Sequence, residues 1–231
     1  MSSVIPDNEM PDNEMPPPLA ETQARMAKAL HEAGRADDAA QLIAISKTKP
    51  AAAIVPLLAA GHRLFGENRV QEAKDKWPSL KAQYDNVDLH LVGPLQTNKV
   101  KEAVALFDTI QTLDREKLAR KLAEMKDESG FPRLFIQVNT GNEPQKSGLA
   151  PAELAAFYGF CTNELGLQIS GLMCLPPQDE PAGAHFILLG KLAEQVGLAQ
   201  LSMGMSGDFE TALALGATHI RVGTALFGAR D

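Results

Sequence analysis

Residues 41–77 read QLIAISKTKPAAAIVPLLAAGHRLFGENRVQEAKDKW, and the pattern in this stretch decides the fold class. A short apolar run at 41–46 is typical of a buried strand, and the alanine- and leucine-rich run at 50–61 is typical of a helix. A weaker strand at 62–66 and a helix at 67–77 repeat the pattern. Strands that alternate with helices in this way predict a parallel sheet.

The same alternation continues to the end of the chain. Six more strands are predicted, at 87–93, 107–113, 133–140, 167–173, 199–204 and 219–228. The other helices are predicted at 19–34, 96–106, 114–128 with Asp114 as its N-cap, 150–164, 182–197 and 206–217. Eight strands, each but the last followed by a helix, within about 190 residues favour a closed (β/α)8 TIM barrel with an extra N-terminal helix. The alternative is a Rossmann-like open sheet, but no strand is followed by a G-x-G-x-x-G motif.

The first 18 residues differ in composition from the rest of the chain. PDNEM occurs at 6–10 and again at 11–15, and three prolines follow, so we expect a disordered tail at 1–18 and one barrel domain at 19–231. The net charge is −7 and no broad basic patch is visible, which argues against a nucleic-acid partner.

The cellular compartment is predicted from features that are missing from the sequence. No basic segment precedes an apolar run at the N-terminus, and no apolar stretch approaches the ~20 residues of a membrane span. The two cysteines, Cys161 and Cys174, do not have the number or spacing of a disulfide framework or a metal site. We therefore expect a cytoplasmic protein without a metal or a membrane partner, and the acidic composition is compatible with a monomer.

A lysine follows the first predicted strand directly. Functional groups of TIM barrels lie at the carboxyl ends of the strands, where Lys47 stands, with Lys49 two residues further along the same face. Burial and a second cation both favour the neutral amine, which can form a Schiff base with an aldehyde. The alternative is a strand-end lysine that only extends its charge into solvent, and position alone favours that alternative.

A phosphate site is predicted after the last two strands. Ser206 is expected to open a helix whose free N–H groups attract an anion, and Gly223 and Thr224 would add further backbone N–H groups. Phosphate binding at this place recurs in TIM barrels, which favours it over a capping serine and a packing glycine. Arg221 lies on the same strand face as Gly223 and needs a partner, which is either a ligand or a neighbouring acid.

Six segments together resemble a known family. They are AISKTKP, FGENRVQEAKDKW, HLVGPLQTNKVK, IQVNTGNEPQKSGL, GLMCLPP and LSMGMSGDFETALALGATHIRVGTALFGAR. In this order they resemble the sequence blocks of the pyridoxal 5′-phosphate (PLP) homeostasis protein family, and the resemblance covers residues 19–230. It implies a barrel similar to the N-terminal domain of bacterial alanine racemase, with PLP held as a Schiff base on Lys47.

The resemblance also implies roles for the other candidate residues. Ser206, Gly223 and Thr224 would surround the phosphate, and Arg221 would face the pyridine nitrogen. The remaining candidates are Asn68, His90 and Met173 around the ring, and Lys146, which matches a second family lysine that influences cofactor exchange. Whether Lys49 or Lys146 holds a second PLP stays open.

Members of the family are described as buffering or delivering PLP without clear catalytic activity. The chain ends soon after the eighth strand, and Tyr84 and Tyr158 are expected in surface segments, so an acid–base partner opposite Lys47 is expected to be missing. The expected partners are PLP and apo forms of PLP-dependent enzymes. Two alternatives remain, a PLP enzyme such as a weak amino-acid racemase and a cofactor-free Schiff-base aldolase.

Overall fold

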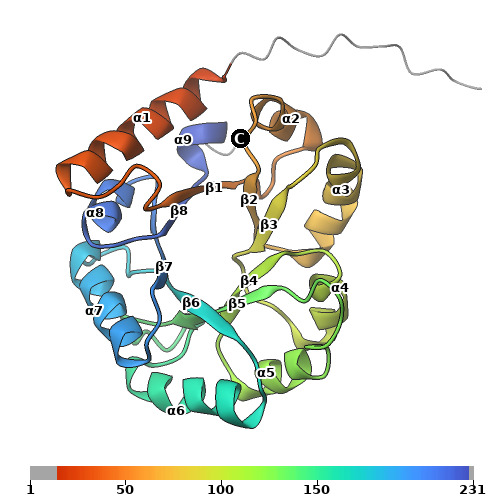
Figure 1. Cartoon of the computed structure of the whole chain (residues 1–231), viewed down its shortest axis with the longest axis vertical. Helices are drawn as coiled ribbons and strands as arrows, with labels where there is room; N and C mark the ends of the chain where they lie inside the picture. The colour runs from red at the N-terminus through yellow and green to blue at the C-terminus, as the bar shows by residue number, and fades with distance from the viewer. Residues whose placement is uncertain (1–14, 229–231) are drawn as a thin grey trace, which may run out of the picture.

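Eight parallel strands close into a barrel, and helices surround it (Figure 1). The computed structural model describes residues 15–228. The strands are β1 Gln41–Ile45, β2 Leu64–Glu67, β3 Asp88–Leu91, β4 Thr109–Leu113, β5 Arg133–Val138, β6 Ile169–Cys174, β7 Gln200–Met205 and β8 His219–Val222. Each strand pairs with the next, and β1 pairs with β8 to close the ring. The predicted TIM barrel is confirmed, and the open Rossmann-like sheet is excluded.

The helices follow the strands in the expected alternation. They are α1 Pro17–Glu32, α2 Ala51–Ala59, α3 Val70–Gln83, α4 Val100–Val104, α5 Glu116–Ala123, α6 Leu154–Gly159, α7 Ala182–Gln195, α8 Phe209–Ala214 and α9 Thr224–Phe227. Short 3-10 or π turns extend α4 and α6 at Thr97–Lys99, Pro151–Glu153 and Phe160–Glu164. Within residues 15–228, no helix combines the length and the apolar character that a bilayer crossing needs.

Several element boundaries differ from the prediction, for example in α3, which spans Val70–Gln83 rather than 67–77. Helix α1 begins at Pro17 rather than Leu19, because proline is tolerated in a first helical turn. The N-cap of α5 is Arg115 rather than Asp114, which instead accepts a hydrogen bond from the Arg115 guanidinium. Helix α8 begins at Phe209 rather than Ser206, and β8 ends at Val222, so that the one-turn helix α9 follows it. The PDNEM repeat falls on residues 6–15, of which 6–14 lie outside the described part of the chain.

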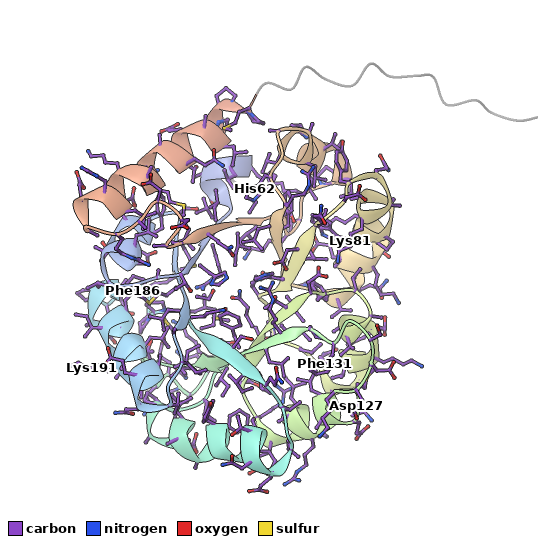
Figure 2. The ribbon with its side chains drawn as sticks, viewed as in Figure 1. His62, Lys81, Asp127, Phe131, Phe186 and Lys191 are labelled. Atoms are coloured by element: carbon purple, nitrogen blue, oxygen red, sulfur yellow. The ribbon has the colours of Figure 1, made fainter. Side chains whose placement is uncertain are left out.

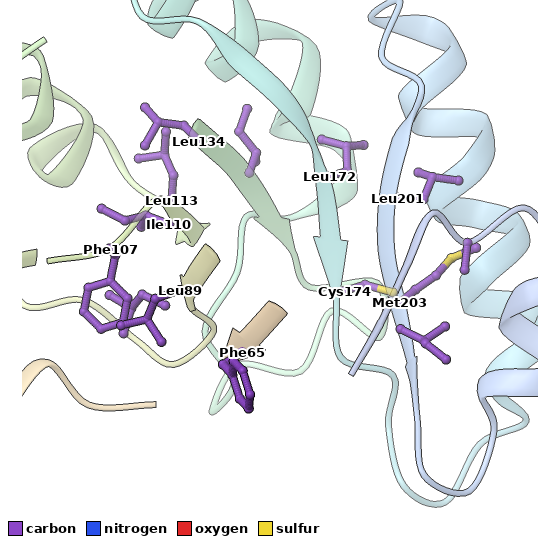
Figure 3. Packing of buried hydrophobic residues seen from close by; sticks show 14 of the residues in the cluster. Phe65, Leu89, Phe107, Ile110, Leu113, Leu134, Leu172, Cys174, Leu201 and Met203 are labelled. Carbon is purple, nitrogen blue, oxygen red and sulfur yellow. The ribbon is translucent and has the colours of Figure 1, made fainter. Parts of the chain in front are cut away.

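Two layers of buried side chains hold the barrel together. Apolar side chains of the strands, such as Phe65, Leu89 and Leu172, pack in the layer between barrel and helices (Figure 3). Phe186 of α7 belongs to this layer, whereas Lys191 on the same helix lies at the outer rim (Figure 2). Because successive side chains of a strand point to opposite faces, the alternate residues fill the barrel interior.

The N-terminal mouth of the barrel carries a partly buried ionic group. Asp88 at the start of β3 accepts a 2.5 Å hydrogen bond from Arg133 at the start of β5, and its Oδ1 lies 3.1 Å from His90 Nε2. Burial alone would raise the pKa of Asp88, but the hydrogen bonds and charges of His90 and Arg133 lower it from 3.8 to about 2. The ionised carboxylate is therefore favoured in the folded state.

This lowered pKa predicts an acid-dependent loss of stability. A carboxyl group whose pKa is lower in the folded state stabilises the fold above its unfolded pKa near 4, and the effect is lost as the pH falls through about 2. We expect Asp88→Asn to lower the urea midpoint at pH 7 and to match the wild type near pH 2. Asp127→Asn, at an exposed position, is the control and should have no effect at either pH. A constant gap between Asp88→Asn and the wild type across this pH range would contradict the assignment.

Candidate functional site

A cavity of about 470 Å³ opens at the C-terminal mouth of the barrel. Seven of the predicted site residues line it, namely Lys47, Lys49, Asn68, Ser206, Arg221, Gly223 and Thr224. They come from the ends of β1, β2, β7 and β8, and the geometry of parallel strands brings these ends to one rim. The cavity therefore gathers an amine, a guanidinium and several backbone N–H groups around one space.

Three predicted residues lie elsewhere. His90 is buried inside the barrel, two residues before Val92, which does line the cavity, so His90 lies one pleat below the cavity lining on this strand. Met173 on β6 is fully buried and does not line the cavity. Lys146 follows β5, where its amine pairs with Glu143 at 2.5 Å and lies 3.4 Å from the carbonyl oxygen of Pro176.

The sequence analysis missed several lining residues. They include Val92, Leu175, Gln178, Met205 and Phe227. Val92 and Leu175 directly follow β3 and β6, so the rule that selected Lys47 could have selected them as well. Phe227 could not be found in that way, because the one-turn helix that carries it was not predicted.

The loops after β7 and β8 form one wall of the cavity. Ser206 and Gly207 lie in a turn that Asp208 closes, since its Oδ1 accepts a 2.6 Å hydrogen bond from the Met205 N–H. Ser206 is therefore a turn residue and does not cap α8. Thr224 instead opens α9 directly after Gly223, and the first N–H groups of a helix have no acceptor within the helix. This wall therefore offers donors to an anion from α9 rather than from α8.

The adjoining part of the cavity wall is the β1–α2 loop, which carries Lys47 and follows a strand that pairs with β8. Its backbone is held by Lys76 of α3, whose buried amine donates to the carbonyl oxygens of Ser46 at 2.8 Å and Lys49 at 3.0 Å. The same amine pairs with Glu67 at 2.8 Å and with Glu72 at 2.9 Å. One buried cation thus fixes the loop on both sides of Lys47.

The residue after Lys47 has an unusual backbone conformation. Thr48 has a φ of 63°, which is strained for a β-branched residue. Its N–H donates to Glu72 Oε1, the same oxygen that the Lys76 amine contacts. The ion pairs of α3 therefore hold the turn at Thr48, and this turn sets the direction in which the loop leaves β1.

Glu67 also pairs with Lys76, and the two residues together form an anchor for the loop that carries Lys47. Glu67 Oε1 accepts hydrogen bonds from Ser46 Oγ at 2.6 Å and from Trp77 Nε1 at 3.0 Å. Burial raises the pKa of Glu67 above its ordinary value, although these donors and Lys76 pull it down. Neither Lys76 nor Glu67 was singled out by the sequence analysis, because their partners come together only in the folded barrel.

Arg221 carries a buried charge at the base of the cavity. Its Nη1 donates to Ser202 Oγ at 2.7 Å and its Nη2 to the carbonyl oxygen of Cys174 at 2.8 Å. Burial lowers the pKa of Arg221, but a guanidinium stays protonated in proteins. No carboxylate of residues 15–228 lies within ion-pair distance of it, so the structural ion pair considered as an alternative is not present. A buried cation of this kind favours an anionic or electron-rich ligand.

Comparison with known proteins identifies the family. A model of the family "Alanine racemase, N-terminal domain" matches residues 22–231. The pyridoxal phosphate homeostasis protein of Vibrio cholerae is 41% identical over 219 residues, which cover 90% of this chain and 93% of the relative. That of Pseudomonas aeruginosa is 40% identical over 222 residues and covers 92% and 94%. The chain belongs to the pyridoxal phosphate homeostasis protein family.

Solved structures agree with membership of the pyridoxal phosphate homeostasis protein family. The structure of PipY from Synechococcus elongatus PCC7942 with PLP bound is 40% identical, has a TM-score of 0.75, and matches 88% of this chain and 100% of that chain. Alanine racemase from Corynebacterium glutamicum is 17% identical with a TM-score of 0.64, and it matches 92% of this chain and 62% of the racemase. The racemase shows the fold alone, and the predicted likeness to its N-terminal domain is confirmed.

The anchor under Lys47 predicts a large effect of one substitution. Lys76→Met leaves Glu67 buried without its cation, so we expect a loss of about 3–5 kcal/mol in the free energy of unfolding. Lys74→Met on the same helix removes a partly exposed pair with Glu102 and should lower the free energy of unfolding far less, because solvent screens that pair. Urea denaturation of both variants tests this expectation. Equal losses in the two variants would show that Lys76 is not an anchor.

Proposed function

We propose that this protein binds PLP as a Schiff base on Lys47 and buffers or delivers the cofactor in the cell. The names of its relatives and the PLP in the PipY structure support this function. The observation that carries it for this chain is the shared cavity of Lys47 and Arg221, in which the buried guanidinium has no carboxylate partner among residues 15–228. PLP has an aldehyde for the amine, a ring nitrogen for the guanidinium and a phosphate for the backbone donors.

The dimensions and the donor groups of the cavity fit PLP. Its volume of about 470 Å³ lies in the range of roughly 300–1,000 Å³ that small-molecule sites occupy. Ser206, Gly223 and Thr224 lie on one wall and supply a hydroxyl and backbone N–H groups for a phosphate dianion. Asn68 and Lys49 line the cavity as well and are proposed to contact the ring or its substituents.

Each residue has a distinct proposed task. The Lys47 amine would hold the cofactor by condensing with its aldehyde group, with loss of one water molecule. Arg221 donates a hydrogen bond to the ring nitrogen and so keeps that nitrogen unprotonated. When bound, PLP supplies an electron-withdrawing ring, and a cation at its nitrogen weakens this property. The arrangement therefore favours holding the cofactor over using it for catalysis.

The surroundings of the cavity also favour a carrier. Thr48, Met205 and Thr224 line it and are exposed, so the cofactor would be reachable from solvent. Neither tyrosine of the chain lines the cavity, since Tyr84 packs under the Arg63 guanidinium and Tyr158 lies in α6. We propose that the recipients are apo forms of PLP-dependent enzymes.

We further propose that the carrier is a cytoplasmic monomer. Cys161 and Cys174 are both buried and form no disulfide, which supports a reducing compartment. Among residues 15–228 the exposed large apolar side chains, Met15, Ile187 and Met205, come from different segments, which supports a monomer. Lys146, outside the cavity, is proposed to influence cofactor exchange.

The Schiff-base position can be tested by chemical reduction. Borohydride treatment of the PLP-loaded protein should fix a phosphopyridoxyl group on the peptide that contains Lys47, as seen by mass spectrometry. Lys47→Ala should lose the visible absorbance of bound PLP. Lys121→Ala, at an exposed lysine of α5, is the control and should keep it. Labelling of another lysine as the main product, or a substrate adduct without PLP, would contradict the proposal.

Delivery is tested separately from binding. We expect the PLP-loaded protein to restore the activity of an apo PLP-dependent enzyme while its own visible absorbance falls. The transfer should persist when an excess of a phosphatase destroys PLP that is free in solution. A loaded protein that never transfers its cofactor would leave PLP binding intact but contradict the delivery role. Exchange of the Cα hydrogen of an amino acid for deuterium would instead favour a racemase.

A further inference from the structure

A chain of buried polar groups crosses the barrel interior from the N-terminal mouth to the cavity. At the mouth, His90 Nε2 lies 3.1 Å from Asp88 Oδ1. Gln111 connects His90 with Ser202, because its Nε2 lies 2.8 Å from His90 Nδ1 and its Oε1 accepts a 2.6 Å hydrogen bond from Ser202 Oγ. Ser202 Oγ in turn accepts a 2.7 Å hydrogen bond from Arg221 Nη1.

The chemistry of these groups allows only one order of donors and acceptors along the hydrogen-bonded series. Ser202 donates its only hydroxyl proton to Gln111, so Arg221 meets an oxygen lone pair. The amide nitrogen of Gln111 then faces His90 Nδ1, which must accept, so the ring proton stands on Nε2, which lies 3.1 Å from Asp88 Oδ1. Burial lowers the pKa of His90, which agrees with a neutral ring. Each group thus depends on the orientation of its neighbour.

The hydrogen-bonded groups lie where most TIM barrels have apolar side chains. Gln111 on β4 and Ser202 on β7 belong to strands that do not pair, so their hydrogen bond spans the barrel interior. Bulky branched apolar residues commonly fill this space in TIM barrels, and they need no hydrogen bonds. Polar residues here supply the Arg221 guanidinium with a second fixed acceptor beside the Cys174 carbonyl oxygen.

We propose that Gln111 and Ser202 are positioning residues that hold the Arg221 guanidinium in the orientation that meets the ring nitrogen of PLP. This inference rests on the proposed function, which gives Arg221 its ligand. Ser202 fixes Nη1 and the Cys174 carbonyl fixes Nη2, so the plane of the guanidinium is set at both ends. Without the Ser202 hydroxyl, the guanidinium keeps one of these two bonds and can turn about it.

The test compares a substitution of a hydrogen-bonded residue with one at a neighbouring buried residue outside the hydrogen-bonded series. Ser202→Ala removes one oxygen atom and should weaken PLP binding about two- to tenfold, which corresponds to one hydrogen bond, and should shift the visible absorption maximum of bound PLP. Ser202→Thr keeps the hydroxyl and should restore both properties. Thr109→Val is the matched control, because Thr109 lies on β4 two residues before Gln111, is fully buried, and its hydroxyl has no hydrogen-bond partner among residues 15–228. It should leave both properties unchanged.

A double variant tests whether the two residues act as one chain. Gln111→Leu should have an effect similar to that of Ser202→Ala, and the double variant should be no worse than the stronger single one. If Gln111→Leu does not fold, the three other single variants still decide the outcome, with the melting temperature of each PLP-free protein as the folding control.

The possible failures can be told apart. If borohydride reduction of the PLP-loaded wild-type protein does not label Lys47, the proposed function fails, and this inference fails with it. A normal Lys47 adduct whose spectrum and affinity do not change in Ser202→Ala would overturn the inference alone. An equal change in Thr109→Val would also overturn it, because any altered buried hydroxyl would then have the same effect.

Discussion

A guanidinium buried inside the barrel is the constraint on which the rest of the site depends. Arg221 stands on β8 in a position that other side chains cover almost completely, and it lines the base of the cavity. Removing a charge from water is costly, and residues 15–228 offer it a hydroxyl and a carbonyl oxygen but no carboxylate. A ligand in the cavity is the remaining source of compensation. The same cavity is lined by Lys47, and the proposed ligand therefore has both an electrophilic carbon and an acceptor atom.

The two walls of the cavity are built in different ways. The wall that carries Lys47 is anchored from behind by Lys76 and its carboxylate partners, which hold a strained turn at Thr48. The wall formed by the loops after β7 and β8 is built from backbone and small side chains at the start of α9. An anchored amine and a wall of backbone donors suit a ligand that is bound covalently at one end and as an anion at the other.

Much of this arrangement could be predicted from the sequence, because it depends on local patterns. The alternation of strands and helices predicted the closed barrel, and the rule that functional groups lie at strand ends made Lys47, Arg221 and Gly223 candidates. Only the family resemblance favoured Lys47 over a lysine that extends into solvent. The depth of His90 below the cavity could not be predicted, since the sequence does not show how far a strand extends before its loop. The anchor at Lys76 and the chain through Gln111 were not predicted, because each connects groups that are far apart along the chain. Helix α9 has only four residues, too short for periodicity to reveal.

A crystal structure of the protein with PLP is the most direct test of the central claim. The account predicts continuous electron density from the Lys47 amine to the cofactor, the ring nitrogen within hydrogen-bond distance of Arg221, and the phosphate beside Ser206, Gly223 and Thr224. Density for PLP at another lysine, or an Arg221 side chain that turns away from the ring to pair with a carboxylate, would contradict it.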